Sequence, residues 1–384
     1  MRQIILLLIL SIGLLTIPCQ PPISVVAQTE TTPQQLQLQL VQKFPGILPR
    51  IISLSPCGKY IAGFGLKEGA KRGGVDTPRE LRVWATSDGT ELLILPKRVT
   101  GHVSFLQFSP DGEQITVINN NMAGLRSWNI KDGKATVSSL NEHLDDDNSP
   151  LRFAYAPNNR LIAVEVPRKR QISIYSILDR EEKMAIDIPS LQVIADLHFT
   201  PDSKHLAIAL NVYPKLTGST RRSSDLRGRL VIWDLTTRKV ALELNNLPSA
   251  ISSMQLSPSG DVLAIGGMEN DDSGTKLIEW RKHNPEIIDL PGQETYDHNS
   301  LAFSPDGKFL FSSGFNKRKD QKTYETSIQV WDWRAKTLHS ATVVQSPTAI
   351  ALSPDGKYLY TATFPEESQL QKWQLPERFH APRK

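Results

Sequence analysis

The sequence predicts an all-β protein: a closed ring of seven four-stranded antiparallel blades. Three observations lead to this fold: a proline turn that recurs seven times, a fixed apolar alternation before each turn, and an aromatic residue later in every unit. The turn prolines lie 44 to 57 residues apart, which is the period of blade-type repeats; they are Pro56, Pro110, Pro157, Pro201, Pro258, Pro305 and Pro354.

The recurring turn has the residues that a type I β-turn favours. Its best copies, 304–308 and 353–357, read Ser-Pro-Asp-Gly-Lys. Proline at the second position presets φ, and glycine at the fourth tolerates the exit geometry. Asn158-Asn159 can serve similarly in the third copy, whereas Ser203 fits less well in the fourth.

Each turn is preceded by the same alternation. The residues four and two positions before the proline are apolar in all seven units, as at Leu301 and Phe303. A period of two indicates a strand with one buried face. A second β-rich run follows each turn, for example residues 161–164, so a hairpin opens each unit.

A third run in each unit ends in an aromatic residue that we expect to pack between blades. A leucine or isoleucine stands three residues before each of them, and a fourth β-rich run, such as 241–244, follows most of them. Four strands in each of seven units account for nearly the whole chain after the first 35 residues. The aromatic positions are Trp84, Trp128, Tyr175, Trp233, Trp280, Trp331 and Trp373.

These turns, together with the Trp-Asp pairs at 233–234 and 331–332, resemble the WD-repeat β-propeller family over about residues 36–375. The resemblance implies a seven-bladed β-propeller and says little about function. Only Gly101-His102 matches the family's Gly-His pair, and the Asp expected six residues before the Trp is missing from every unit. In the family these residues form a polar network within each blade. Here most of that network is missing, so packing must replace it. The turns also resemble those of TolB-like propellers, which are the second candidate family.

The last unit lacks an outer strand, because Pro376 would block a ladder position soon after Trp373. Residues 36–41 alternate cleanly, and we expect them to complete the last blade and remove an open edge. The alternative is a disordered Gln-rich linker. The propeller is thus placed at 36–376, with a C-terminal tail at 377–384.

The N-terminus has the layout of a secretory signal peptide. Arg2 precedes an apolar run at 4–17, and Val25-Val26-Ala27 offers a cleavage site, so residues 1–27 are the predicted signal and 28–35 a disordered linker. The run is short for a membrane span of about 20 residues. We therefore expect export to a periplasmic or extracellular location; an anchor that stays uncleaved, or lipid attachment at Cys19, is the alternative.

The expected function is binding, through the face that carries the long connections between second and third strands and the connections between blades. Basic and acidic patches alternate there, which favours a protein with an acidic surface or an anionic polymer over nucleic acid, whose binding favours a continuous basic stripe with aromatics. The candidate binding residues are Lys71, Arg72, Lys215, Arg221, Arg222, Arg227, Lys317, Arg318 and Lys319.

No catalytic, metal or cofactor motif is found: H-E-x-x-H, G-x-S-x-G and a phosphate loop before a helix are all missing. The sequence therefore favours an exported, non-catalytic scaffold or recognition module that acts as a monomeric ring. The alternative is a hydrolase or lyase with an active site assembled in the central channel or on the face that carries the long connections. A central cluster of carboxylates or histidines would favour the enzyme.

The exported protein should begin near Gln28. Intact-mass spectrometry of the mature chain measures this start directly. Retention of Met1 would contradict cleavage and support the anchored alternative.

Overall fold

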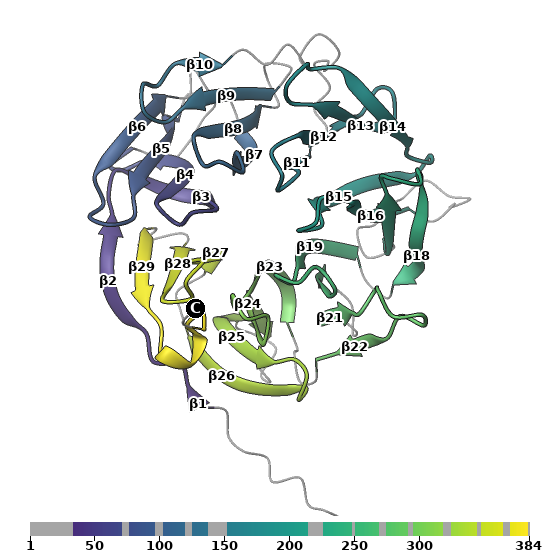
Figure 1. Ribbon diagram of the computed structural model, residues 1–384. Coiled ribbons are helices and arrows are strands. Elements are labelled where there is room, and N and C mark those ends of the chain that lie inside the picture. The colour runs from purple at the N-terminus through teal and green to yellow at the C-terminus, as the bar shows by residue number, and fades with distance from the viewer. Residues whose placement is uncertain are drawn as a thin grey trace, which may run out of the picture. The chain divides into compact units, whose positions relative to one another are not determined.

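The structure is a computed structural model that describes residues 34–382 apart from eleven internal segments: 71–76, 97–102, 120–124, 137–151, 214–225, 248–249, 269–273, 291–294, 318–323, 344–346 and 364–368. The predicted signal peptide and most of the predicted linker lie outside this part. Seven antiparallel blades surround a common centre (Figure 1), as predicted. The first strand of each blade is the innermost one.

The first four blades use consecutive strands throughout. Their bounds are β3 (Ile47–Leu54), β4 (Tyr60–Lys67), β5 (Arg79–Ala85) and β6 (Glu91–Pro96); β7 (Val103–Phe108), β8 (Gln114–Asn119), β9 (Leu125–Asn129) and β10 (Ala135–Thr136); β11 (Phe153–Tyr155), β12 (Leu161–Val166), β13 (Gln171–Ser176) and β14 (Glu182–Asp187); β15 (Gln192–Phe199), β16 (His205–Val212), β17 (Arg227–Asp234) and β18 (Lys239–Leu247).

Blades 5 and 6 are built the same way, and one bridge between Met268 and Asp297 joins them. Blade 7 takes three strands from the end of the chain. The bounds are β19 (Ala250–Leu256), β20 (Leu263–Met268), β21 (Thr275–Ile278) and β22 (Ile287–Asp289); β23 (Thr295–Phe303), β24 (Phe309–Lys317), β25 (Tyr324–Asp332) and β26 (Thr337–Val343); β27 (Pro347–Leu352), β28 (Tyr358–Thr363) and β29 (Leu370–Gln374).

In most blades, the residue before the turn proline stabilises the turn between the first and second strands through hydrogen bonds of its side-chain hydroxyl. In blade 6 the Ser304 hydroxyl accepts from Phe309 N at 2.9 Å and donates to Asp306 Oδ1 at 2.5 Å. The buried hydroxyl thus satisfies a backbone donor that would otherwise lack a partner. The same bonds form at Ser109 and Ser353, and Thr200 takes the role in blade 4.

The fourth position of these turns is left-handed even where glycine is missing. Gly307 has φ +70°, and Asn159 and Ser203 adopt φ +57° and +56° at the equivalent positions. Ser203, which fits the pattern poorly, gains a contact there, because its Oγ accepts from Asn158 N of the neighbouring blade at 3.1 Å. The turns also pack in a ring: a Cβ on Gly58 would lie 2.8 Å from Pro354 Cδ, so blade 1 touches blade 7 closely here.

The aromatic at the end of each third strand sits at or near the blade interface. Five of the seven predicted aromatics are buried, while Trp233 and Trp373 are half-buried. In four blades the pairing of the third and fourth strands shifts register at this residue, as between Val330 and Trp331. Such a bulge adds local twist. Trp373 Nε1 donates to Thr361, whereas Trp331 Nε1 is buried with no partner among the described residues.

The ring is closed by the N-terminal segment, as predicted. Strand β2 (Gln39–Phe44) pairs antiparallel with β29 and forms the outer strand of blade 7 (Figure 1). It starts three residues later than the predicted 36–41 strand. The reason is a second contact: β1 (Gln34–Gln35) runs parallel to β26 of blade 6, and Leu36 N donates to Ala341 O at 2.9 Å. Residues 34–35 of the predicted linker are therefore strand.

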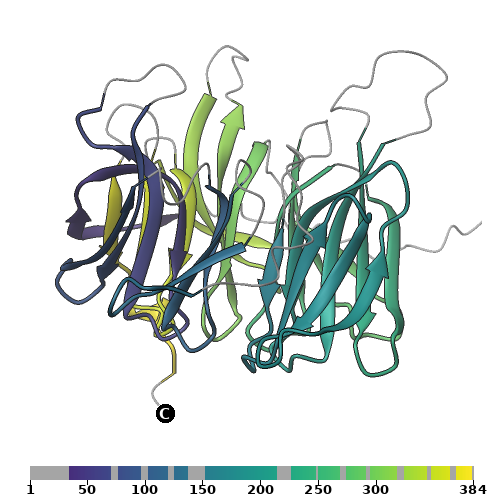
Figure 2. The same cartoon turned by 90° about the horizontal axis from the view of Figure 1, so that it is seen from above.

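The C-terminal tail also packs on the ring. A 3-10 turn spans Glu377–Phe379, and the buried Phe379 ring lies 5.0 Å from that of Phe309 and 5.2 Å from that of Phe311. Leu36 belongs to the same apolar cluster, so segments from both ends of the chain meet here. Ala381 N donates to Asp355 O at 2.8 Å, which places the tail on the face with the proline turns (Figure 2).

Replacing Phe44 by alanine should destabilise the ring by about 3 to 5 kcal/mol, because a fully buried aromatic would be lost from its closing strand. Phe44 contacts Trp84 of blade 1 and Tyr360 of blade 7, with ring centroids 5.8 and 6.3 Å away. Chemical denaturation measures the change. Val41→Ala is the control, since Val41 lies on the same strand and is 47% exposed. Equal stability of the two variants would contradict the closing role of β2.

Candidate functional site

Two of the nine predicted binding residues lie in the part of the chain that the structure describes. We call the side with the second-to-third-strand and blade-to-blade connections the insertion face, and the side with the proline turns the turn face (Figure 2). Arg227 is exposed at the start of β17, and Lys317 ends β24. The other predicted residues lie outside the described part of the chain: Lys71, Arg72, Lys215, Arg221, Arg222, Arg318 and Lys319.

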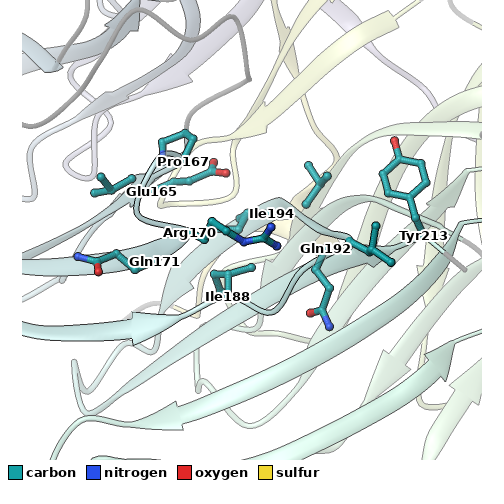
Figure 3. Close-up of a pocket in the computed structure, with 11 residues that line it drawn as sticks. Glu165, Pro167, Arg170, Gln171, Ile188, Gln192, Ile194 and Tyr213 are labelled. Carbon is teal, nitrogen blue, oxygen red and sulfur yellow. The ribbon is translucent and has the colours of Figure 1, made fainter. Parts of the chain in front are cut away.

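A pocket of about 540 Å³ opens on the insertion face between blades 3 and 4 (Figure 3). Its size is within the range of ligand sites in proteins, about 300 to 1,000 Å³. It is formed where β12 and β13 of blade 3 meet β15 and the end of β16 of blade 4. The walls are apolar with a few polar groups; the lining residues are Glu165, Val166, Pro167, Arg170, Gln171, Ile188, Leu191, Gln192, Val193, Ile194 and Tyr213.

Two short connections hold the pocket in shape. Arg170 ends the turn after β12 and Leu191 ends the connection between the blades; both have positive φ, +52° and +67°. Such a conformation is strained for a residue with a side chain, and it persists only where other contacts hold it. Here Arg170 Nη2 donates to Pro189 O at 2.7 Å, and Tyr213 N donates to Leu191 O at 2.8 Å. The pocket rim is therefore an ordered part of the fold.

Glu165 is an acidic residue in this largely apolar pocket. It is 9% exposed, and its Oε2 has no hydrogen-bond partner among the described residues. Burial raises the pKa of this carboxyl to about 8, although the nearby Arg152 guanidinium acts in the opposite direction. A charged carboxylate loses hydration in such a place, so the proton stays on at neutral pH. Glu165 is thus an uncharged acid that can donate a hydrogen bond.

The surroundings of the pocket are basic. Arg168, Lys169 and Arg170 are consecutive exposed residues of the turn after β12, and Arg227 pairs with Val212, the residue before Tyr213. Arg229 Nη1 donates to Gln192 Oε1 at 2.7 Å at the same edge, and its charge is paired with Glu243. With Glu165 uncharged, the positive charges of the turn face no carboxylate inside the pocket.

Sequence reasoning missed this pocket. Two signals in the sequence point toward it: Glu165 interrupts the apolar strand 161–166, and residues 168–170 form a short basic turn. The connection after β12 is short, whereas the predicted binding residues come from the long insertions. Neither signal shows that the two blades form a common cavity.

The innermost strand of blade 4, β15, carries a histidine beside a carboxylate, residue types whose clustering at the centre would favour the enzyme alternative. His198 Nε2 lies 3.4 Å from Asp196 Oδ2 on β15. The Asp196 carboxylate, however, accepts from the backbone N of Leu197 at 2.9 Å and of Met254 at 3.1 Å. Met254 belongs to β19, so the carboxylate connects blade 4 to blade 5, and these bonds account for its burial without a reaction.

Among the described residues, no group of three or more His, Cys, Asp or Glu side chains is placed to hold a metal ion. None of the helices in that part of the chain is long and apolar enough to cross a membrane.

Comparison with known proteins supports the repeat and the fold. The family described as "WD domain, G-beta repeat" matches residues 287–332, from the outer strand of blade 5 to the third strand of blade 6. Among solved structures, the beta-propeller domain of Cps50 (Swd1) from Myceliophteria thermophila is similar, with a TM-score of 0.63 and 14% identity; the match covers 88% of this chain and 100% of that one. At that identity the likeness shows the fold alone. No curated protein sequence matches the chain.

The stability of the protein should fall as the pH rises from about 4.5 to about 8, the ordinary and the raised pKa of Glu165. In this window the folded state holds a proton that the unfolded state has released, so higher pH favours unfolding. Each unit of pKa difference corresponds to about 1.4 kcal/mol, so the loss is on the order of a few kcal/mol.

Glu165→Gln isolates this contribution, because the amide does not titrate and other groups cancel in the difference between the two proteins. The free energy of unfolding at several pH values measures it. The variant should lose less stability than the original protein as the pH rises. Parallel pH profiles would mean that Glu165 does not hold a proton in the folded state.

Proposed function

We propose that this chain, a WD-repeat β-propeller, is a non-catalytic scaffold that binds a partner protein through its insertion face. The proposal rests on one observation: polar side chains are bonded within their own turns on one face, whereas the other face has a pocket with exposed basic residues beside it. On the turn face, carboxylates such as Asp306 and Asp355 accept backbone hydrogen bonds inside their own turns. The insertion face has a formed pocket and exposed basic residues beside it.

The fold class supports the same proposal. Propellers of this type are commonly interaction scaffolds, in which a rigid ring presents variable connections. Two of the basic residues predicted from the sequence lie where strands adjoin these connections: Arg227 is exposed at the start of β17, and Lys317 ends β24. We propose that they bind an acidic partner surface together with Arg168 and Lys169. The layout of residues 1–27 further supports a location outside the cytoplasm.

Reversing charge on the insertion face should weaken partner capture and make it less sensitive to salt. The variant combines Arg168→Glu, Lys169→Glu and Arg227→Glu, three exposed basic positions of the described chain. One exposed ion pair is worth only about 0 to 1 kcal/mol, so three are changed together. Affinity capture at low salt and at 1 M salt measures the effect, since the screening length falls to about 3 Å at 1 M.

The turn face offers a matched control. Arg180, Arg238 and Lys336 are exposed basic residues, all with positive φ, in the turns between third and fourth strands. Their combined reversal to glutamate makes the same change in net charge on the opposite face and should leave capture intact. Capture that responds equally to both triple variants, or to neither, would contradict binding through the insertion face.

A further inference from the structure

We infer that the pocket between blades 3 and 4 is a binding site for an acidic side chain of a partner segment, with an apolar neighbour of that residue packed on the pocket wall. The inference rests on the proposed function and assigns it a specific site and a ligand chemistry. It follows from four features of the described residues: an ordered guanidinium, a buried acid without a hydrogen-bond partner, an apolar wall that is partly exposed, and a basic rim.

Arg170 supplies the group that would bind the carboxylate. Its guanidinium has five N–H donors in a planar fork that matches a carboxylate. Among the described residues, it donates only to Pro189 O, through Nη2, and this bond holds the side chain at the pocket. Because the side chain is already ordered, less conformational entropy is lost when a ligand binds.

Glu165 supplies a second polar group inside the pocket. Its Oε2 is buried without a partner, and a buried polar atom in that state is costly. An uncharged Glu165 also adds no negative charge that would repel a carboxylate near Arg170.

The pocket wall explains why the ligand would be part of a peptide and not a free anion. Ile188, Ile194 and Val193 are among the lining residues, and Val193 is 38% exposed. Apolar area removed from water is worth about 25 cal/mol per Å². A peptide with an apolar residue beside its acidic residue could bury this wall.

Charge decides between an acidic and a basic ligand. The turn after β12 has three consecutive basic residues, 168–170, and Arg152 is close enough to Glu165 to lower its pKa. Among the described residues beside the pocket, the exposed Asp187, across the strand pair from Gln171, opposes them. A lysine of a partner would therefore meet an excess of positive charge, whereas an acidic residue would be attracted.

The test uses three capped pentapeptides, acetyl-Gly-Leu-Xaa-Leu-Gly-amide, in which Xaa is Glu, Gln or Lys, titrated into the full mature chain and followed by calorimetry or NMR. The Glu peptide should bind saturably, on the order of tenfold tighter than the Gln peptide, a difference of about 1.4 kcal/mol. Tighter binding of the Lys peptide, or no saturable binding of any peptide at millimolar concentration, would overturn the inference.

Variants assign the binding to the pocket. Arg170→Gly should abolish the preference for the Glu peptide without unfolding the protein, because glycine favours the positive φ at this position. Arg180→Gly is the control: Arg180 is an exposed arginine of the same blade with φ +61°, on the turn face. Glu165→Gln should keep the preference, since an amide is uncharged as well. Equal loss in both glycine variants would overturn the inference.

The two proposals fail in different ways. If no peptide binds while the insertion-face reversal still abolishes partner capture, the pocket inference is wrong and the scaffold proposal stands. If the Glu peptide binds through Arg170 while capture ignores the insertion face, the scaffold proposal is wrong and the pocket remains an acidic-peptide site. Dextran sulfate that binds through Arg170 where the Glu peptide does not would assign the pocket to an anionic polymer and overturn the inference.

Discussion

The pairing of β2 with β29 is the contact on which the rest of the structure depends. A ring of blades has no open edge only if its last blade is completed, and an unpaired strand edge invites association with other chains. Here a strand from the start of the folded chain completes the blade that is otherwise built from its end. Phe44 then packs against Trp84 and Tyr360, and Gly58 meets Pro354, so blades 7 and 1 are joined both near the rim and at the turns.

The two faces of the ring are built differently. The turn face is occupied by its own hydrogen bonds, in which Ser304 and its equivalents bind the backbone five residues later. The insertion face carries the connections between second and third strands, which differ in length from blade to blade. A rigid ring with one variable face is suited to binding a partner, and it needs no large movement to do so.

The pocket between blades 3 and 4 shows one departure from what stability alone would select. Glu165 is a buried acid with an unpartnered oxygen. An apolar residue at 165 would suit a purely structural role. Departures of this kind gather at functional sites, where binding requires a group that the fold itself does not favour.

The sequence by itself determined the repeat: the proline turns, the apolar positions before them and the aromatic of each third strand are local patterns, which is why the seven blades could be predicted. It also identified the closing segment, but misplaced its strand by three residues, because β1 pairs with β26 of blade 6 and Leu36 joins the apolar cluster there, far from it along the chain. Only the tertiary structure decided the pocket. Glu165 and Arg170 belong to one blade and Val193 and Ile194 to the next, and their apposition depends on how two sheets pack, which no spacing along the chain encodes.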